Sequence, residues 1–320
     1  MKSKKEYVVL VLVIVALSAY LVAHKEGSVH YKLPRLEKLN SKNITKLAIK
    51  SASSDIALEE KGGKWLILPQ GFPAKSEPVE TMTEKVSGLT LTALASGAGH
   101  DSVYGLDESN AIKVSAYHGD KLLRSFEVGK SASSGRQTFV KLNGDDRVYY
   151  ADGGIRYPFD KKIADILDKT VLSFTEDITG MTVERGGSRS GFVKASGPGP
   201  KVKGGAGNSA PKWHTVAGAI ADGGRIGQII STLSNLSCDA FVPSKTKEDF
   251  KKPAYIVTLT GKKSYSLSLF KKEGDKYPAL SSQSNRPFYL RKGQAETLAK
   301  DLAALSGTAK KVRSHKGKNG

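Results

Sequence analysis

Ile44-Thr45-Lys46-Leu47 and Lys64-Trp65 return later in the chain as Ile178-Thr179-Gly180-Met181 and Lys212-Trp213. The offset is 134 residues between the two isoleucines that open these stretches and 148 between the two tryptophans. A drifting offset is expected when loops of unequal length interrupt one shared order of elements. The sequence therefore predicts a tandem duplication, which sets the domain count before any single residue is interpreted.

The length and composition agree with two folded domains. A chain of 320 residues is long enough for two hydrophobic cores. Hydrophobic residues make up 39% and charged residues 25%, which is ordinary for folded protein and excludes wholesale disorder. After a linker over residues 24–43, we expect an α+β fold with one unit over residues 44–177 and a second over 178–306. Each unit is predicted to be an antiparallel sheet with packed helices.

The excess positive charge lies in the second unit. Residues 178–306 contain 20 Lys and Arg against 9 Asp and Glu, whereas residues 44–177 contain 17 against 19. Residues 307–320 add five basic residues and no acidic one, which predicts a disordered basic tail. A one-sided basic surface favours an acidic partner such as a glycan, an anionic lipid or a nucleic acid, although lysines also serve solubility.

The N-terminus has the pattern of a membrane anchor. Residues 1–6 contain three lysines, and residues 7–23 form a run of 17 residues without a charge. Because the small-residue pattern of a cleavage site is poor, an uncleaved transmembrane signal anchor is predicted over a cleaved signal peptide or a buried core helix. The dense lysines place residues 1–6 in the cytoplasm and the rest of the chain outside. The expected location is the bacterial inner membrane, crossed once.

Hydrophobic periodicity predicts a common order of elements in both units. Val79, Met82, Val86 and Leu89 recur at helical spacing, and residues 159–167 predict a second helix that closes the first unit. Between these helices, four strand-like runs separated by turn signals predict an antiparallel meander. The second unit repeats this plan, except that residues 186–211 are rich in Gly, Ser, Pro and Lys. We expect them to form a long inserted loop.

The sequence contains no catalytic signature. The six histidines lack metal-ligand spacing, and the single cysteine, Cys238, follows an apolar stretch and is expected to be buried. The Gly-rich stretch 199–207 lacks the Gly-Lys-Ser/Thr ending of a phosphate loop. We therefore expect no catalytic residue, no metal and no cofactor, and a protein that is not an enzyme.

Lysines supply the one candidate binding site. They flank the predicted loop and crowd a segment before a strand, where they could contact phosphate or carboxylate groups in a salt-dependent manner. The candidate anion-contact patch consists of Lys201, Lys203, Lys212, Lys245, Lys247, Lys251 and Lys252. Only Phe250 and Trp213 are available nearby for base stacking. A nucleic-acid partner is therefore expected only if the second unit faces the cytoplasm.

Several short motifs resemble those of a known bacterial family. They are Lys64-Trp65, Tyr104-Gly105-Leu106-Asp107, the strand containing Val114 and Ala116, and Phe126-Glu127-Val128-Gly129. Together with the N-terminal apolar run and the amphipathic helix, they resemble the domain-of-unknown-function family 4340. In the second unit Asp249-Phe250-Lys251 stands where Tyr-Gly-Leu would fall, so the two units are expected to differ.

The resemblance implies a membrane-anchored protein associated with ABC-type transport systems related to gliding-motility components, and it implies no catalytic residue. The expected function is a non-enzymatic accessory or scaffold of a bacterial envelope transport complex, with the subunits of that complex as partners. The alternative is a polyanion-binding module that uses the basic second unit and tail. Trp65, Tyr104, Gly105, Leu106 and Trp213 are expected to be packing landmarks.

Overall fold

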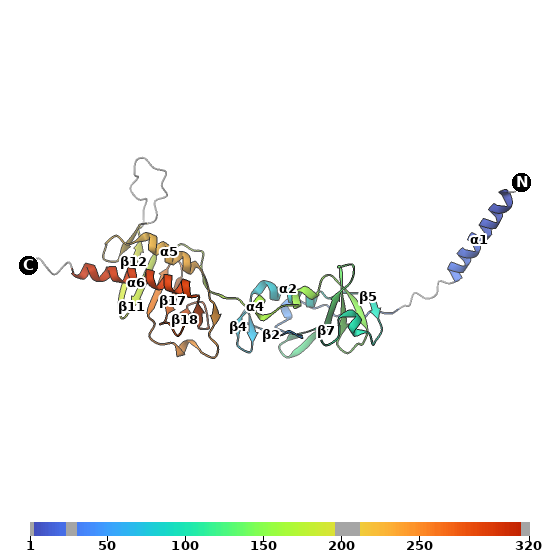
Figure 1. Ribbon diagram of the computed structural model, residues 1–320, viewed down its shortest axis with the longest axis horizontal. Coiled ribbons are helices and arrows are strands. Elements are labelled where there is room, and N and C mark those ends of the chain that lie inside the picture. Colours follow the sequence, from blue (N-terminus) through green and yellow to red (C-terminus); the bar gives the residue numbers. More distant parts are fainter. Residues whose placement is uncertain (1–2, 24–30, 196–211, 315–320) are drawn as a thin grey trace, which may run out of the picture. The chain divides into compact units, whose positions relative to one another are not determined.

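The computed structural model describes residues 3–23, 31–195 and 212–314 of the chain (Figure 1). The chain divides into two compact units. One unit contains residues 1–56 and 80–162, and the other contains residues 57–79 and 163–320. The hairpin within residues 57–79 therefore belongs to the same compact unit as the C-terminal half of the chain, although it is distant from it in sequence.

The first sheet has nine strands in the order β4-β3-β2-β1-β6-β7-β8-β9-β5. Its strands are β1 (Lys46–Ser51), β2 (Ser54–Lys61), β3 (Lys64–Leu68), β4 (Phe72–Pro73), β5 (Leu91–Ser96), β6 (Ile112–His118), β7 (Lys121–Ser131), β8 (Gln137–Leu142) and β9 (Val148–Asp152). Leu47 and Ile49 in β1 are buried while Ala48 between them is exposed. One face of the sheet therefore carries the core and the other is open to solvent.

Helix α2 (Ser76–Ser87) covers part of the core with the apolar side chains expected from its sequence. Val79, Met82 and Val86 are fully buried, which confirms the predicted amphipathic helix. The last carbonyls of a helix lack partners within it, and here the guanidinium of Arg124 in β7 donates to the carbonyl oxygens of Val86 and Ser87. Arg124 thereby fixes the end of α2 against the sheet.

The predicted closing helix over residues 159–167 is wrong, because two separate one-turn helices occupy this stretch. They are α3 (Arg156–Phe159) and α4 (Ile163–Ile166). The residue after α3, Asp160, has ψ 67°, which lies outside the helical region and ends the helix. The short helix η1 (Ser41–Asn43) precedes β1, and η2 (Asp101–Tyr104) precedes β6.

The second sheet has eight strands in the order β13-β12-β11-β16-β17-β18-β19-β15. Its strands are β11 (Gly180–Arg185), β12 (Ser188–Lys194), β13 (Trp213–Thr215), β15 (Ala240–Phe241), β16 (Tyr255–Thr260), β17 (Ser264–Leu269), β18 (Tyr277–Ser281) and β19 (Phe288–Leu290). Position by position, this strand order matches the order β3-β2-β1-β6-β7-β8-β9-β5 in the first sheet. A strand position in one sheet therefore has a definite counterpart in the other.

Two longer helices cover the second sheet. α5 (Gly223–Ser234) buries Ile226, Ile229 and Leu233, and α6 (Lys292–Ser314) contacts β11, β12 and β16. Cys238 lies in this core, as expected, and its burial raises the pKa of the thiol to about 11. β10 (Thr170–Ser173) pairs with β14 (Asn235–Ser237) in a separate two-stranded sheet, and η3 (Lys247–Asp249) precedes β16.

The predicted transmembrane anchor is corrected by the structure. α1 (Ser3–Ala23) is helical, but within the described residues no helix is long and apolar enough to cross a membrane. The uncharged run of 17 residues rises about 26 Å as a helix, below the roughly 30 Å of bilayer hydrocarbon. The predicted fold class with an N-terminal transmembrane helix is therefore wrong. The predicted location, a single-pass protein of the bacterial inner membrane, is also wrong. The chain consists mostly of antiparallel sheet.

Two other predicted segments contain regular structure. β12 lies within residues 186–211, which were expected to be a loop, and residues 196–211 of that stretch lie outside the described residues. α6 runs to Ser314 and so enters the predicted tail over residues 307–320, whose last six residues are not described.

Candidate functional site

The second sheet separates the lysines of the predicted anion-contact patch. Lys212 lies just before β13, and Lys251 and Lys252 lie just before β16. The start of β13 is level with the end of β16, as shown by the register row His214, Val193, Gly180 and Thr260. Lys212 and the pair before β16 therefore lie at opposite ends of the sheet, roughly 15 Å or more apart. Lys201 and Lys203 lie outside the described residues.

The lysines around η3 are partly engaged with their own surroundings. The ammonium of Lys245 lies 3.9 Å from Glu273 and 5.2 Å from the centre of the Phe250 ring. Lys247 Nζ donates to the carbonyl of Ser281 at 3.3 Å. Lys251 and Lys252 are exposed. Hydrogen bonds from Thr246 lower the pKa of Asp249, and the charge of Lys251 helps to lower it further. Among the described lysines, the structure therefore separates Lys212 from those around η3.

The tryptophan landmarks lie at equivalent places, in β3 and β13. Trp65 is 9% exposed and Trp213 is 3% exposed, so both contribute to cores rather than to a surface. After each strand the chain turns and returns in the same way. The amide of Ala74 donates to the carbonyl of Trp65, and the amide of Ala221 donates to that of Trp213, both at 2.8 Å.

The family-like stretch from Tyr104 to Leu106 packs directly on β7. Gly105 has φ 65° and caps η2, a conformation that favours glycine. Leu106 is buried with Phe139 and Val148. A Cβ atom added at Gly129 would lie 2.3 Å from the carbonyl oxygen of Tyr104. The structure thus brings together two motifs that carry the resemblance in sequence, at a distance that only glycine permits.

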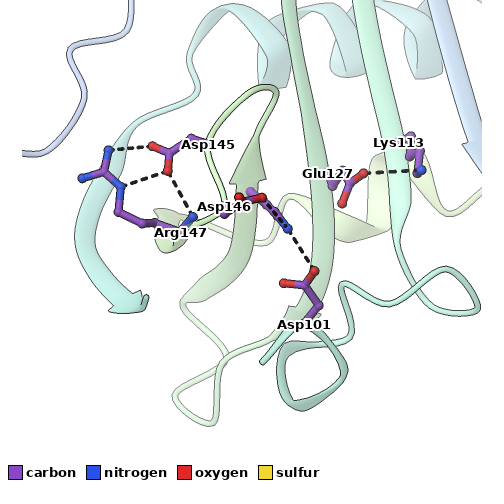
Figure 2. Close-up of polar contacts among 7 residues, drawn as sticks. Asp101, Lys113, Glu127, Asp145, Asp146 and Arg147 are labelled. Carbon is purple, nitrogen blue, oxygen red and sulfur yellow. Dashed lines mark hydrogen bonds and ion pairs between the residues drawn. The ribbon is translucent and has the colours of Figure 1, made fainter. Parts of the chain in front are cut away.

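A charged cluster surrounds the hairpin between β8 and β9 (Figure 2). The Asp145 carboxylate accepts from the Arg147 guanidinium at 2.9 and 2.7 Å and from the Tyr149 hydroxyl at 2.6 Å. The bond from Arg147 holds the pKa of Asp145 well below its usual range, while burial raises the pKa of Tyr149 to about 12. Lys141 pairs with Asp101 at 2.9 Å beside this cluster. Within the described residues, no group of His, Cys, Asp and Glu side chains could hold a metal ion.

The turn between β3 and β4 packs on the edge of the second sheet, inside one compact unit. The Phe72 ring stacks on the ring of Phe241 in β15, with centroids 5.1 Å apart and planes inclined by 21°. The guanidinium of Arg286, two residues before β19, lies 6.0 Å from the centre of the Phe72 ring and donates to the carbonyl of Gln70. The sequence gives no local signal for this contact, because Phe72 and Phe241 lie far apart in the chain.

The corresponding turn after β13, residues 216–220, is an exposed apolar surface, which we call the apolar turn. Val216 is 76% exposed and Ile220 is 85% exposed. The turn is nevertheless well hydrogen-bonded: the amide of Thr215 donates to Ala219 at 2.7 Å, and the amide of Val216 donates to Gly191 at 3.0 Å. These two large apolar side chains are therefore exposed to solvent on a turn whose backbone is ordered by hydrogen bonds.

A model of the family described as a domain of unknown function, DUF4340, matches residues 65–258. This range covers more than half of the 320 residues. The chain belongs to the DUF4340 family. No curated protein and no solved structure matches it. The prediction made from the Tyr104 and Gly129 motifs is therefore confirmed at the level of the family.

The DUF4340 match runs from β3 to β16 and so includes both turns that follow the tryptophan strands. It also includes Leu94 and the Asp145–Arg147 pair. The family description names no activity, so a function can be proposed only from the side chains exposed on these surfaces.

Acidification should weaken this DUF4340 protein partly through Asp145. A carboxylate whose pKa is depressed by folding stabilises the fold above its unfolded pKa of about 4, and that contribution is lost as the pH falls through the acid range. Asp145→Asn should be less stable than the unmodified chain at pH 7 by about 1 kcal/mol. The free energies of unfolding of the two proteins should converge as the pH falls towards 2, as measured by urea unfolding followed by circular dichroism. Glu108→Gln, which changes an exposed carboxylate, serves as the control, and a constant difference for Asp145→Asn at every pH would contradict the prediction.

Proposed function

We propose that this chain is a non-enzymatic accessory or scaffold subunit of an ABC-type transport complex, and that it binds protein partners through the apolar turn. The observation that carries the proposal is the exposure of Val216 and Ile220 on an ordered backbone. Exposed apolar side chains gain free energy when a partner removes them from water, at about 25 cal/mol per Å². Because the turn is already ordered, little conformational entropy is lost on binding.

The equivalent turn of the first sheet supports a binding role for the apolar turn. The turn at residues 69–72 occupies the same place after its tryptophan strand, and it is packed against an aromatic side chain and a guanidinium. A turn at this position of the sheet is thus able to pack on a strand edge. The apolar turn has no comparable partner among the residues that the structure describes, which leaves it available to a second molecule.

A second candidate function is polyanion binding, which the charge of the second unit favours. Lys251 and Lys252 are exposed just before β16. The neutralising contact of Lys245 with Glu273 and the separation from Lys212 argue against one continuous anion surface. If this candidate holds, heparin or anionic-lipid binding should weaken with salt and fall when Lys245, Lys247, Lys251 and Lys252 are replaced by alanine.

Affinity purification from the native host tests the protein-binding function. The tagged full chain should recover permease and ATPase subunits of a transport complex, identified by mass spectrometry. The double variant Val216→Ser/Ile220→Ser should recover at least about tenfold less of them. Val103→Ser, which changes a valine that is 56% exposed in the other unit, is the matched control. Equal recovery by the double variant and the unmodified chain would contradict the proposal, as would the recovery of no transport subunit.

A further inference from the structure

The packed turn at residues 69–72 shows which side chains form the surface that binds such a turn, which we call the receptor. Phe72 stacks on Phe241 of β15, and Phe241 pairs in register with Phe288 of β19. Arg286 lies two residues before Phe288 and donates to the carbonyl of Gln70 in the turn. The receptor therefore consists of a hydrophobic side chain on the edge strand and an arginine at the start of its neighbour.

Strand register identifies the counterpart of this receptor in the first sheet. We follow the residues that are paired across neighbouring strands, starting at the first residue of β6 in the first sheet and of β16 in the second. Each such row of paired residues ends at the edge strand of its sheet. The two rows are Ile112, Val128, Val140, Tyr149 and Leu94 in the first sheet, and Tyr255, Leu269, Ala279, Phe288 and Phe241 in the second. Leu94 thus takes the place of Phe241, and Tyr149 takes the place of Phe288.

The arginine of the receptor is also present in the first sheet. Arg147 lies two residues before Tyr149, as Arg286 lies two residues before Phe288. Its side chain is 46% exposed and is oriented by two hydrogen bonds to Asp145, as Figure 2 shows. A guanidinium has five N–H donors, so Arg147 can keep Asp145 and still donate to a carbonyl oxygen. Leu94 is half-buried, and within the described residues β5 pairs with β9 alone.

Among the described residues, the chain therefore presents a turn without a packed partner in one unit and a receptor without a packed turn in the other. Both contacts would be hydrophobic, although the register places Ala219, and not Val216 or Ile220, at the position of Phe72. In the packed contact an aromatic ring of the turn meets an aromatic ring of the receptor. In the unoccupied pair the turn offers Val216 and Ile220, and the receptor offers Leu94, so aliphatic side chains would meet. The turn backbone would supply the carbonyl that Arg147 needs.

We propose that the apolar turn of one copy packs on Leu94 and Arg147 of a second copy, forming a head-to-tail contact. This inference rests on the proposed function, because it names the partner of the same turn. Turn and receptor are different surfaces, so the interface is heterologous, and each added copy again presents one free turn and one free receptor. Repeated contacts of this kind build either a closed ring or an open chain of copies.

Sedimentation velocity of the purified full chain over a range of concentrations tests the proposal. The weight-average sedimentation coefficient should rise with concentration. Val216→Ser/Ile220→Ser, which removes the turn, and Leu94→Ser/Arg147→Ala, which removes the receptor, should each associate about tenfold or more weakly. Val103→Ser should behave as the unmodified chain. Circular dichroism should show that both double variants are folded like the unmodified chain. If the spectrum of Leu94→Ser/Arg147→Ala differs, the single variant Leu94→Ser replaces it.

Mixing the two double variants gives the decisive result. The turn variant keeps an intact receptor and the receptor variant keeps an intact turn, so the equimolar mixture should form 1:1 dimers that cannot extend. A mixture without dimers would overturn the proposal, and so would an unmodified chain that is monomeric at every concentration. If the chain is monomeric but the turn variant still loses transport subunits in the purification above, the self-association is wrong while the proposed function stands.

Discussion

Replacing Gly129 by alanine should destabilise the first unit by about 3 kcal/mol or more, because overpacking at a rigid contact has few ways to relax. The added Cβ would lie 2.3 Å from the carbonyl oxygen of Tyr104 and 3.0 Å from a side-chain carbon of Leu106. The first of these neighbours is backbone, and it belongs to a stretch that Gly105 caps in a left-handed conformation. Either η2 or β7 must therefore move.

Urea unfolding followed by circular dichroism measures this effect. Gly154→Ala is the matched control, because a Cβ at Gly154 would meet no atom within 4 Å. The control should change the unfolding midpoint little, while Gly129→Ala should lower it clearly. Equal midpoints for the two variants would show that the close approach of Tyr104 and Gly129 does not exist in solution.

Replacing Trp213 by alanine should cost about 3–5 kcal/mol in the second unit, the range found when a buried large aromatic side chain is removed. Trp213 is 3% exposed and belongs to the core formed with α5 and α6. It also begins β13, a strand of three residues that carries the apolar turn. Its loss should therefore both lower stability and loosen the turn, so self-association should fall with it.

Circular dichroism is again the right signal, since removing one of the two tryptophans changes the fluorescence probe itself. Tyr157→Ala serves as the control, because it removes an aromatic ring that is 76% exposed. The control should change stability by less than about 1 kcal/mol. A Trp213→Ala protein as stable as the control would mean that β13 does not contribute to the core.

Short-range patterns predicted most of the strands and the two amphipathic helices with long apolar repeats. Val79, Met82 and Val86 are buried on one face of α2, as their spacing indicates. The same logic failed over residues 159–167, because the conformation of Asp160 ends α3 there. It also failed at the N-terminus, where a long apolar run predicts a membrane span although it is a few residues too short.

The candidate site was mostly beyond sequence reasoning. Lysines near one another in sequence were expected to form one patch, but strand direction places Lys212 and Lys252 at opposite ends of the sheet. Val216 and Ile220 carried no signal, because a short apolar segment is usually core and only the fold reveals their exposure. Arg147 was one surface charge among many until the register related it to Arg286.

By itself the sequence determined the family. It also predicted two units and buried tryptophans, although the structure places residues 57–79 in the same compact unit as residues 163–320. These properties depend on local spacing and on motifs that recur along the chain. The tertiary structure decided which of two similar turns is packed and which is exposed. It also decided that Leu94 and Arg147 form the counterpart of Phe241 and Arg286. Such relations join residues distant in sequence, and the pairing of whole strands sets them, so no local pattern records them.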